Sequence, residues 1–262
     1  MKVVVSRRIP EAGLDRLRRE AEVVVLQTDE EQAPDRDAFL AAARDADVLV
    51  TLLSESVDRQ ILAANPRLLG VAQMAVGYDN LDLAVATELG IPMSNTPGVL
   101  TETTADFTWA MLLAVARRVP EAHAYTAAGR FRIWGPNLFL GGDVGPGADG
   151  VRKVLGIVGY GRIGEAVARR AVGFGLRILA YGPRSRERID ADPKVEWADL
   201  DELLATADFV TLHTPLSDET RHLIDAAALA RMRSTAYLIN AARGPVVDEA
   251  ALVAALRDRV IA

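Results

Sequence analysis

Three glycines follow the spacing G-x-G-x-x-G in the segment Gly159-Tyr-Gly161-Arg162-Ile163-Gly164. An apolar run precedes them and a helical pattern follows, which is the context in which this spacing binds phosphate. Gly159 would permit a tight turn, Gly161 a close approach of backbone to a pyrophosphate, and Gly164 close packing of helix on strand. The first N–H groups of the helix would then face a dinucleotide. A tight turn without a ligand is the alternative.

The residues after the next predicted strand, 176–181, bear on the choice of nucleotide. They read Gly-Pro-Arg184-Ser185-Arg186, and no Asp or Glu lies between Glu165 and Glu187. A carboxylate at this strand end would bind a ribose 2′-hydroxyl, whereas guanidinium groups bind phosphate through paired hydrogen bonds. The sequence therefore favours NADP(H) as the cofactor, with NAD(H) as the second option. A solvated basic loop is the alternative.

One further arginine follows the last predicted strand, in the segment Asn240-Ala241-Ala242-Arg243-Gly244. Ligands of open parallel sheets bind beyond the carboxyl ends of the strands. Arg243 is therefore placed to clamp a carboxylate with two hydrogen bonds. A structural ion pair is the alternative role for this side chain.

Alternating strands and helices must position these residues, and the chain has this alternation twice, which predicts an α/β protein with two doubly wound parallel sheets. The predicted strands are 2–6, 22–26, 48–52, 68–72, 154–158, 176–181, 209–212 and 236–239. The predicted helices are 10–20, 36–44, 59–64, 79–89, 101–119, 162–172, 200–205, 226–231 and 249–257. Asp35, Asp58 and Asp248 are expected N-caps, Gly90 ends one helix, and Pro120 is expected to stop the helix 101–119. Residues 129–150 are rich in Gly and Pro and predict an arm or linker.

Composition narrows the classes of partner. The 262 residues carry a net charge of −6, so we expect no nucleic-acid partner. The apolar stretch 107–115 is far shorter than a membrane span, so we expect no membrane partner. The absence of cysteine excludes disulfides, thiolate catalysis and cysteine-ligated metal, and we expect no metal. The apolar run at the N-terminus is too short for a signal peptide, so we expect a cytoplasmic protein.

With these segments in view, the chain resembles the D-2-hydroxyacid dehydrogenases, in particular their glyoxylate/hydroxypyruvate reductase branch. Five ordered segments carry the resemblance: Met74-Ala-Val-Gly-Tyr-Asp-Asn80, Gly90-Ile-Pro-Met-Ser-Asn-Thr-Pro-Gly98, the glycine motif, Leu212-His-Thr-Pro-Leu-Ser-Asp-Glu-Thr220 and Asn240-Ala-Ala-Arg-Gly244. The resemblance implies a flavodoxin-like substrate domain at 1–98 and a Rossmann dinucleotide domain at 99–262, with a cleft between them. It also implies hydride transfer between a nicotinamide and a small 2-oxo acid.

The resemblance also assigns roles to individual residues. Arg243 would hold the substrate carboxylate and stabilise charge on the carbonyl oxygen. The backbone N–H groups of Val76 and Gly77 would bind the same carboxylate, with Leu53 nearby. Trp134 matches a tryptophan that the reductase branch contributes across a dimer interface, so we expect a homodimer. The residues that would lie beside the cofactor are Thr104, Gly159, Gly161, Arg162, Ile163, Gly164, Arg184, Ser185, Arg186, Pro215, Thr220, Ala241, Ala242 and Arg243.

The proton donor is not among these residues. The resemblance places a Glu and then a His, which together act as general acid and base, beyond the position of Ala262. We therefore expect this chain to lack the C-terminal part of the Rossmann domain and to show little activity by itself. His123, His213 and His222 are given no catalytic role. A formate or phosphite dehydrogenase on the same scaffold, or a catalytically incomplete dinucleotide-binding interaction protein, are the alternative functions.

Overall fold

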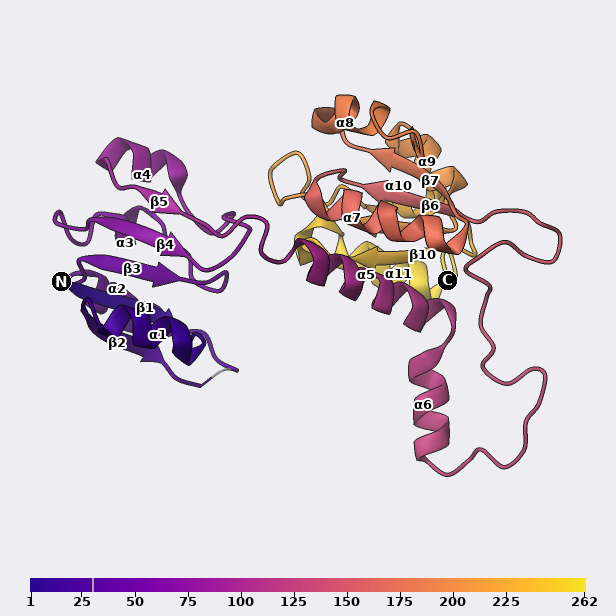
Figure 1. Ribbon diagram of the computed structural model, residues 1–262, viewed down its shortest axis with the longest axis horizontal. Helices are drawn as coiled ribbons and strands as arrows, with labels where there is room; N and C mark the ends of the chain where they lie inside the picture. Colours follow the sequence, from indigo (N-terminus) through magenta and orange to yellow (C-terminus); the bar gives the residue numbers. More distant parts are fainter. Residues whose placement is uncertain (30) are drawn as a thin grey trace. The chain divides into compact units, whose positions relative to one another are not determined.

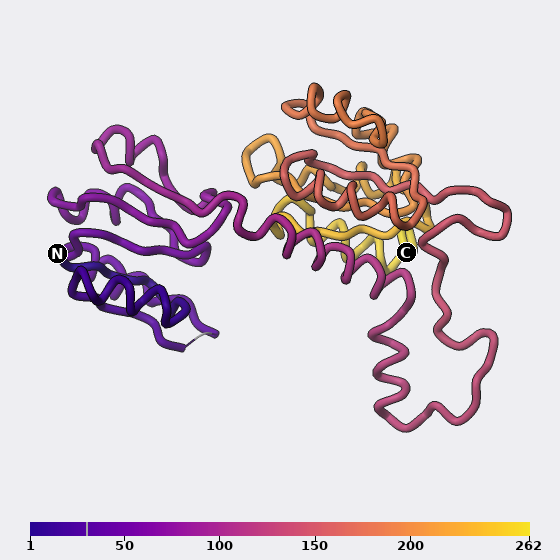
Figure 2. Tube along the Cα trace, viewed as in Figure 1, coloured from indigo at the N-terminus to yellow at the C-terminus, as the bar shows by residue number. Residues whose placement is uncertain are grey.

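The computed structural model describes residues 1–29 and 31–262. Its contacts divide the chain into two compact units, Met1–Val99 and Leu100–Ala262 (Figure 2). Each unit is described by itself below. Both have the α/β architecture that the alternation predicts, and each is built around one five-stranded parallel sheet.

The sheet of the first unit has the order β2-β1-β3-β4-β5. Alternate residues of its strands face opposite layers. Val4 and Leu49 pack under α2, α3 and α4, whereas Val3, Val5 and Val50 pack with Leu14 of α1. The elements are β1 (Lys2–Arg7), α1 (Glu11–Arg18), β2 (Glu22–Gln27), α2 (Arg36–Ala43), β3 (Val48–Thr51), α3 (Arg59–Leu62), β4 (Gly70–Gln73), α4 (Leu83–Leu89) and β5 (Met93–Ser94). This strand order is that of the flavodoxin-like folds.

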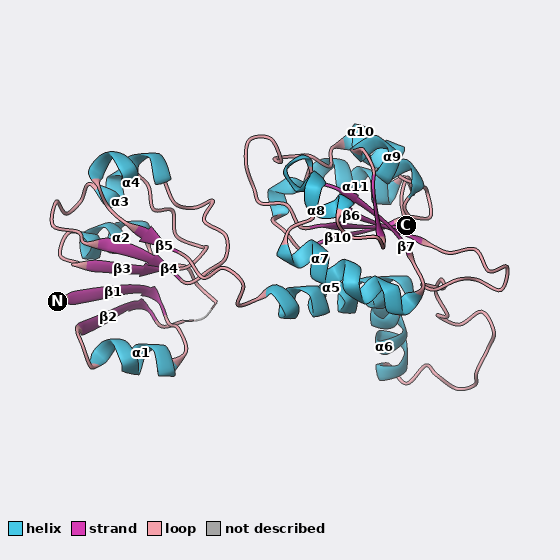
Figure 3. Ribbon diagram, turned by 45° about the horizontal axis from the view of Figure 1, so that its top comes forward, coloured by secondary structure: helices cyan, strands magenta, loops and turns pink. Residues whose placement is uncertain are grey.

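The sheet of the second unit has the order β10-β9-β6-β7-β8, so successive strands are added on one side of β6 and then on the other. Helices α5 and α7 cover one face, and α9, α10 and α11 cover the other (Figure 3). The strands are β6 (Val154–Val158), β7 (Arg177–Tyr181), β8 (Val195–Trp197), β9 (Phe209–Leu212) and β10 (Tyr237–Asn240). The helices are α5 (Thr101–Ala116), α6 (Val119–Ala127), α7 (Arg162–Ala171), α8 (Arg186–Asp190), α9 (Leu200–Thr206), α10 (Ala226–Arg231) and α11 (Glu249–Arg257), with 3-10 turns η1 (Val172–Phe174), η2 (Pro183–Ser185) and η3 (Gly244–Val246).

The aspartate caps expected from sequence are confirmed. Asp35 accepts from the backbone N–H groups of Asp37 and Ala38, Asp58 from that of Ile61, and Asp248 from that of Ala251. Gly90 ends α4 in the left-handed conformation, with φ of 68°. These contacts satisfy N–H groups that the first turn of a helix leaves without backbone partners.

Two predictions about helices were wrong. Pro120 does not stop the helix predicted at 101–119. Helix α5 ends at Ala116, Arg118 turns the chain with φ of 53°, and Pro120 then lies in the first turn of α6. Proline is tolerated there because its missing N–H would have no helical partner. The helix predicted at 79–89 begins only at Leu83, where Asp82 caps it. Strands β5 and β8 and helices α6 and α8 were not expected from the sequence.

Helix α6 and the chain up to residue 150 form an arm, which projects from the sheet of its unit (Figure 1). None of the residues of α6 is buried. Large apolar side chains are exposed along the arm: Ile133 is 78% exposed and Trp134 is 68% exposed. The base of the arm is fixed, because Gly142 donates its N–H to the carbonyl oxygen of Ala116 over 2.8 Å. Among the described residues, no helix is both long and apolar enough to cross a bilayer.

Candidate functional site

The glycine turn after β6 is packed on its protein side and open at its centre. Gly159 has φ of +97°, and a Cβ there would lie 2.7 Å from the carbonyl carbon of His213. A Cβ at Gly164 would lie 2.3 Å from the carbonyl oxygen of Gly159. A Cβ at Gly161 would meet no described heavy atom within 4 Å. Gly159 and Gly164 are thus required by the fold itself, and only Gly161 faces open space.

The N-terminus of α7 extends this open side. In the described structure no side chain caps the helix. The N–H groups of its first turn, from Arg162 to Gly164, therefore have no acceptor within the helix. Such a helix end carries partial positive charge and binds phosphate.

Tyr160 anchors the turn from beneath, a role the sequence reading missed. Its ring is fully buried and its hydroxyl donates to Oδ2 of Asp192 over 3.0 Å. Burial, followed by the hydrogen bond to Asp192, raises the pKa of Tyr160 above its ordinary value. The buried Tyr160 side chain therefore attaches the glycine turn to the core of the second unit.

The two arginines after β7 have different surroundings. Arg184 is 85% exposed at its side chain, and its Nη2 lies 3.1 Å from Oε2 of Glu219. Arg186 begins α8, donates from Nε to Oδ2 of Asp190 over 2.8 Å, and stacks over the ring of Trp197 at 4.2 Å from its centroid. Ser185 closes the turn between them with its N–H on the carbonyl oxygen of Gly182. Arg184 therefore projects into solvent, while Arg186 is held against its own unit.

Unpaired polar atoms lie at the end of β9. Neither ring nitrogen of His213 nor Oγ1 of Thr214 has a hydrogen-bond partner among the described residues, although all three atoms are buried. Burial lowers the pKa of His213 to about 4, so the imidazole is neutral at ordinary pH. The loop continues through Pro215, whose carbonyl oxygen accepts from the hydroxyl of Thr220 over 2.6 Å. Buried polar atoms of this kind are normally satisfied by water or a ligand.

Asn240 shapes the turn that carries Arg243. Its Oδ1 accepts from the N–H of Ala242 over 3.0 Å, and its Nδ2 donates to the carbonyl oxygen of Arg243 over 2.8 Å. The half-buried Arg243 itself donates from Nη1 to the carbonyl oxygen of Ala242. The side chain of Asn240, at the end of β10, thus bonds to both Ala242 and Arg243 and holds the turn at Ala241–Arg243. His222, by contrast, lies in a turn with φ of 53° that pairs with Pro245.

In the first unit, a buried network joins the two loops that carry Leu53, Val76 and Gly77. Glu55 accepts from the hydroxyl of Ser6 over 2.6 Å and from the N–H of Leu52 over 2.7 Å. Asn80 donates to the carbonyl oxygens of Leu52 and Glu55. Neither Glu55 nor the role of Asn80 was expected from the sequence. Their partners are distant in the chain: Leu52 lies 28 residues from Asn80, and Ser6 lies 49 residues from Glu55.

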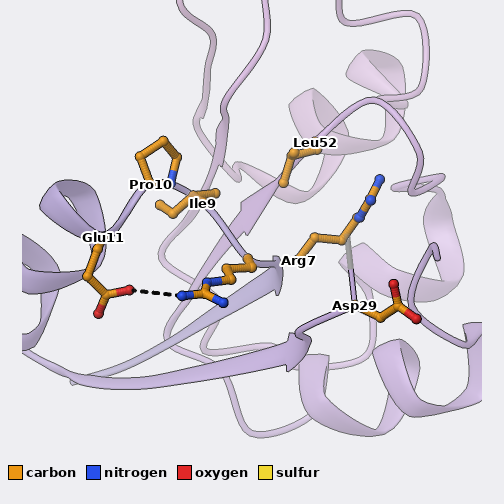
Figure 4. Close-up of a pocket in the computed structure, with 7 residues that line it drawn as sticks. Arg7, Ile9, Pro10, Glu11, Asp29 and Leu52 are labelled. Carbon is orange, nitrogen blue, oxygen red and sulfur yellow. Dashed lines mark ion pairs between the residues drawn. The ribbon is translucent and has the colours of Figure 1, made fainter. Parts of the chain in front are cut away.

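A hollow of about 530 Å³ opens at the edge of the first sheet where strands β1, β2 and β3 end (Figure 4). Arg7, Arg8, Asp29 and Leu52 are among its lining residues, and Arg8 lies 4.0 Å from Glu11 as an ion pair. Leu53, the residue after Leu52 in the chain, is 45% exposed. The hollow thus lies beside the loop that the resemblance assigns to substrate.

The predicted site residues therefore gather in two sets. Leu53, Val76 and Gly77 lie on loops at the carboxyl edge of the first sheet. The other set lies on loops at the carboxyl edge of the second sheet and comprises the glycine turn, Arg184–Arg186, Pro215–Thr220 and Ala241–Arg243. Thr104 lies in the first turn of α5, which packs on α7. Trp134 lies on the arm, outside both sets.

Known proteins of similar sequence show the family to which this chain belongs. Residues 109–262 match the family described as D-isomer specific 2-hydroxyacid dehydrogenase, NAD binding domain. The chain is 47% identical over 262 residues to a glyoxylate reductase of Korarchaeum cryptofilum, covering all of this chain and 76% of that protein. It is 48% identical over 265 residues to a glyoxylate reductase of Thermococcus gammatolerans, covering 77% of it. This chain belongs to the D-isomer specific 2-hydroxyacid dehydrogenases.

Solved structures agree with this assignment. The crystal structure of the TT0316 protein of Thermus thermophilus superposes on this dehydrogenase with a TM-score of 0.87 at 42% identity, covering 98% of this chain and 78% of that one. D-lactate dehydrogenase from Aquifex aeolicus, in complex with NAD and lactic acid, gives a TM-score of 0.83 at 26% identity, covering 100% and 74%. The dehydrogenase thus spans about three quarters of the length of its relatives.

The predicted family and reaction class are confirmed. The dehydrogenase transfers a hydride between a nicotinamide cofactor and a small 2-oxo or 2-hydroxy acid. The cofactor chemistry fits the second unit on three observations made above: the open space at Gly161, the uncapped start of α7, and the buried polar atoms of His213 and Thr214.

Proposed function

We propose that this dehydrogenase reduces glyoxylate or hydroxypyruvate and prefers NADP(H) to NAD(H). The cofactor preference rests on one observation: an exposed guanidinium, that of Arg184, follows β7, where a carboxylate would otherwise bind the ribose 2′-hydroxyl. The substrate class is supported by the relatives, two of which are glyoxylate reductases at 47% and 48% identity.

Each residue then has a defined task. The N–H groups of α7 and of Gly161 bind the pyrophosphate, and Arg184 binds the 2′-phosphate. Ser185 and Arg186 shape the loop around the adenosine end of the dinucleotide. The rest of the dinucleotide is bordered by Thr104, Pro215, Thr220, Ala241 and Ala242. When bound, the dinucleotide supplies or accepts the hydride.

Four residues are assigned to the substrate: Leu53, Val76, Gly77 and Arg243. Arg243 binds the substrate carboxylate and stabilises negative charge on the carbonyl oxygen, because its guanidinium stays charged throughout. The resemblance assigns the N–H groups of Val76 and Gly77 to the substrate carboxylate and Leu53 to its surroundings. In this proposal residues 1–98 contribute to substrate binding, and residues 99–262 bind the cofactor and also supply Arg243 to the substrate.

Binding measurements test the cofactor proposal directly. Titration of the protein with NADPH and with NADH, followed by fluorescence, should give tighter binding of NADPH. Arg184→Ala should weaken NADPH and leave NADH unchanged, since only NADPH has the 2′-phosphate. Equal affinities of the unaltered protein for the two cofactors would contradict the proposal.

A panel of small acids tests the substrate proposal. Calorimetric titration of the protein–NADP⁺ complex should show binding of glyoxylate and hydroxypyruvate and weaker binding of formate. Tighter binding of formate would favour the formate-dehydrogenase alternative. Cofactor binding with no binding of any acid would favour the dinucleotide-binding interaction protein.

We also propose a homodimer formed through the arm. The support is that α6 buries none of its residues, while Phe131, Ile133 and Trp134 expose large apolar surfaces beside it. Apolar area of this kind is typically covered in a stable interface. The cytoplasmic location expected from the sequence stays a prediction, which cell fractionation would test.

A further inference from the structure

An ion pair joins the two loops that flank the glycine turn. Strand β6, which carries the turn, lies between β7 and β9 in the sheet. Arg184 follows β7, Glu219 follows β9, and their side chains meet at 3.1 Å. Because the strands are parallel, both loops leave the same edge as the turn. The pair therefore closes the rim of the proposed adenosine site.

The carboxylate of Glu219 makes the kind of contact that the 2′-phosphate requires. Both are anionic oxygen acceptors, and a guanidinium binds either through charge-assisted hydrogen bonds. Arg186 offers no equal substitute, because Asp190 and Trp197 already hold it. A nucleotide with a 2′-phosphate therefore competes with Glu219 for the Nη2 donors of Arg184, whereas one with a 2′-hydroxyl does not.

We propose that Glu219 is a specificity-determining residue that occupies Arg184 until the 2′-phosphate displaces it. Its carboxylate thereby weakens NADP(H) binding and so lowers the ratio of NADP(H) affinity to NAD(H) affinity. This inference rests on the proposed binding of the 2′-phosphate by Arg184. Both side chains are well exposed, at 85% and 74%, so water screens the pair. Exposed pairs of this type contribute little, and the corresponding change in affinity is about two- to fivefold.

The test is a double-mutant cycle on cofactor binding. Dissociation constants of NADPH and NADH are measured for the unaltered protein, Glu219→Gln, Arg184→Ala and the double variant. Glu219→Gln should bind NADPH about two- to fivefold more tightly and NADH with unchanged affinity. In the Arg184→Ala background, Glu219→Gln should have no effect, because the group that it competes for is gone.

Asp218→Asn provides the matched control. It removes one negative charge from the neighbouring exposed position of the same loop, and it should change NADPH binding less than Glu219→Gln does. An equal effect of the two variants, or a Glu219→Gln effect that persists without Arg184, would mean general charge repulsion and would overturn the inference. No effect of Glu219→Gln on NADPH would overturn it as well.

The cycle separates this inference from the proposal beneath it. If Arg184→Ala leaves the ratio of NADPH to NADH affinity unchanged, the proposed binding of the 2′-phosphate fails, and the inference fails with it. If Arg184→Ala weakens NADPH while Glu219→Gln changes nothing, only the role of Glu219 is wrong. Thermal melts should coincide for all variants, since every substituted side chain is exposed.

Discussion

The side-chain amide of Gln73 donates from Nε2 to Oδ1 of Asn80 over 2.7 Å. This contact fixes which way the Asn80 amide points, so that its Nδ2 reaches the carbonyl oxygens of Leu52 and Glu55 at 2.9 and 2.7 Å. Gln73 is itself held by the hydroxyl of Thr51 at 2.6 Å. Two loops from separate strands are thereby locked together, and these loops carry the residues proposed to bind the substrate carboxylate.

Asn80→Ala should loosen both loops. The substitution leaves two carbonyl oxygens and the amide of Gln73 without this partner, which we expect to lower the free energy of unfolding by about 1–3 kcal/mol. Binding of glyoxylate to the NADP⁺ complex should weaken, while binding of NADPH by the second unit should not change. Urea denaturation and calorimetry measure the two effects. Gln32→Ala, at an exposed position of the first unit, is the control and should behave as the unaltered protein.

The glycines of the turn should separate folding from binding. Gly164→Ala places a Cβ 2.3 Å from the carbonyl oxygen of Gly159, so it should destabilise the second unit by about 1–3 kcal/mol. Gly161→Ala meets no described atom, so the melting temperature should hold while NADPH and NADH both bind at least about tenfold more weakly. Equal loss for both cofactors is expected because both carry the pyrophosphate. Unchanged affinity in Gly161→Ala would refute the placement of the pyrophosphate.

His213 should make stability depend on pH. Burial lowers its pKa from 6.5 to about 4, so between these values the unfolded chain binds more protons than the folded protein. The free energy of unfolding should therefore fall as pH falls through this window, with a slope of up to about 1.4 kcal/mol per pH unit from this residue. His213→Gln should lose that part of the slope in urea denaturation at pH 7 and pH 5. His123→Gln, which alters an exposed imidazole, should keep it, and equal slopes in all three proteins would count against the burial effect.

Charge placed on the arm should prevent association. Ile133→Asp combined with Trp134→Asp puts two carboxylates where the homodimer would bury apolar surface. Sedimentation velocity at micromolar concentration should show a dimer for the unaltered protein and a monomer for the double variant. Leu69→Asp, which alters a side chain that is 61% exposed in the first unit, should remain dimeric. A monomer before any substitution would disprove the dimer.

Local patterns were sufficient for most of the fold. Asp35 and Asp248 follow the N-cap rule from sequence alone, because a cap involves only the next three residues. Strand β8 was not predicted, because its three residues include Glu196 and show no apolar run. Pro120 was misread because a proline can end one helix or begin the next, and the left-handed turn at Arg118 decided between them.

The site was less accessible to sequence than the fold. Arg184 and Arg186 look equivalent in a basic loop, yet α8 begins at the second of them and Trp197 stacks on it. The network around Glu55 and Asn80 joins residues far apart in the chain, so no local spacing reveals it. Motifs placed the glycine turn correctly after β6, but they could not show that His213 and Thr214 would be left without protein partners among the described residues.

The packing of the glycine turn has a thermodynamic consequence. Gly159 abuts the backbone of His213, and Gly164 abuts Gly159, so both ends of the segment 159–164 are closely packed before any ligand arrives. Ordering a flexible segment costs about 1–2 kcal/mol per residue, and here that entropy is lost when the chain folds instead of when the dinucleotide binds. Cofactor affinity is in this way coupled to folding: a substitution far from the ligand that loosens the turn would weaken binding without removing a single contact to it.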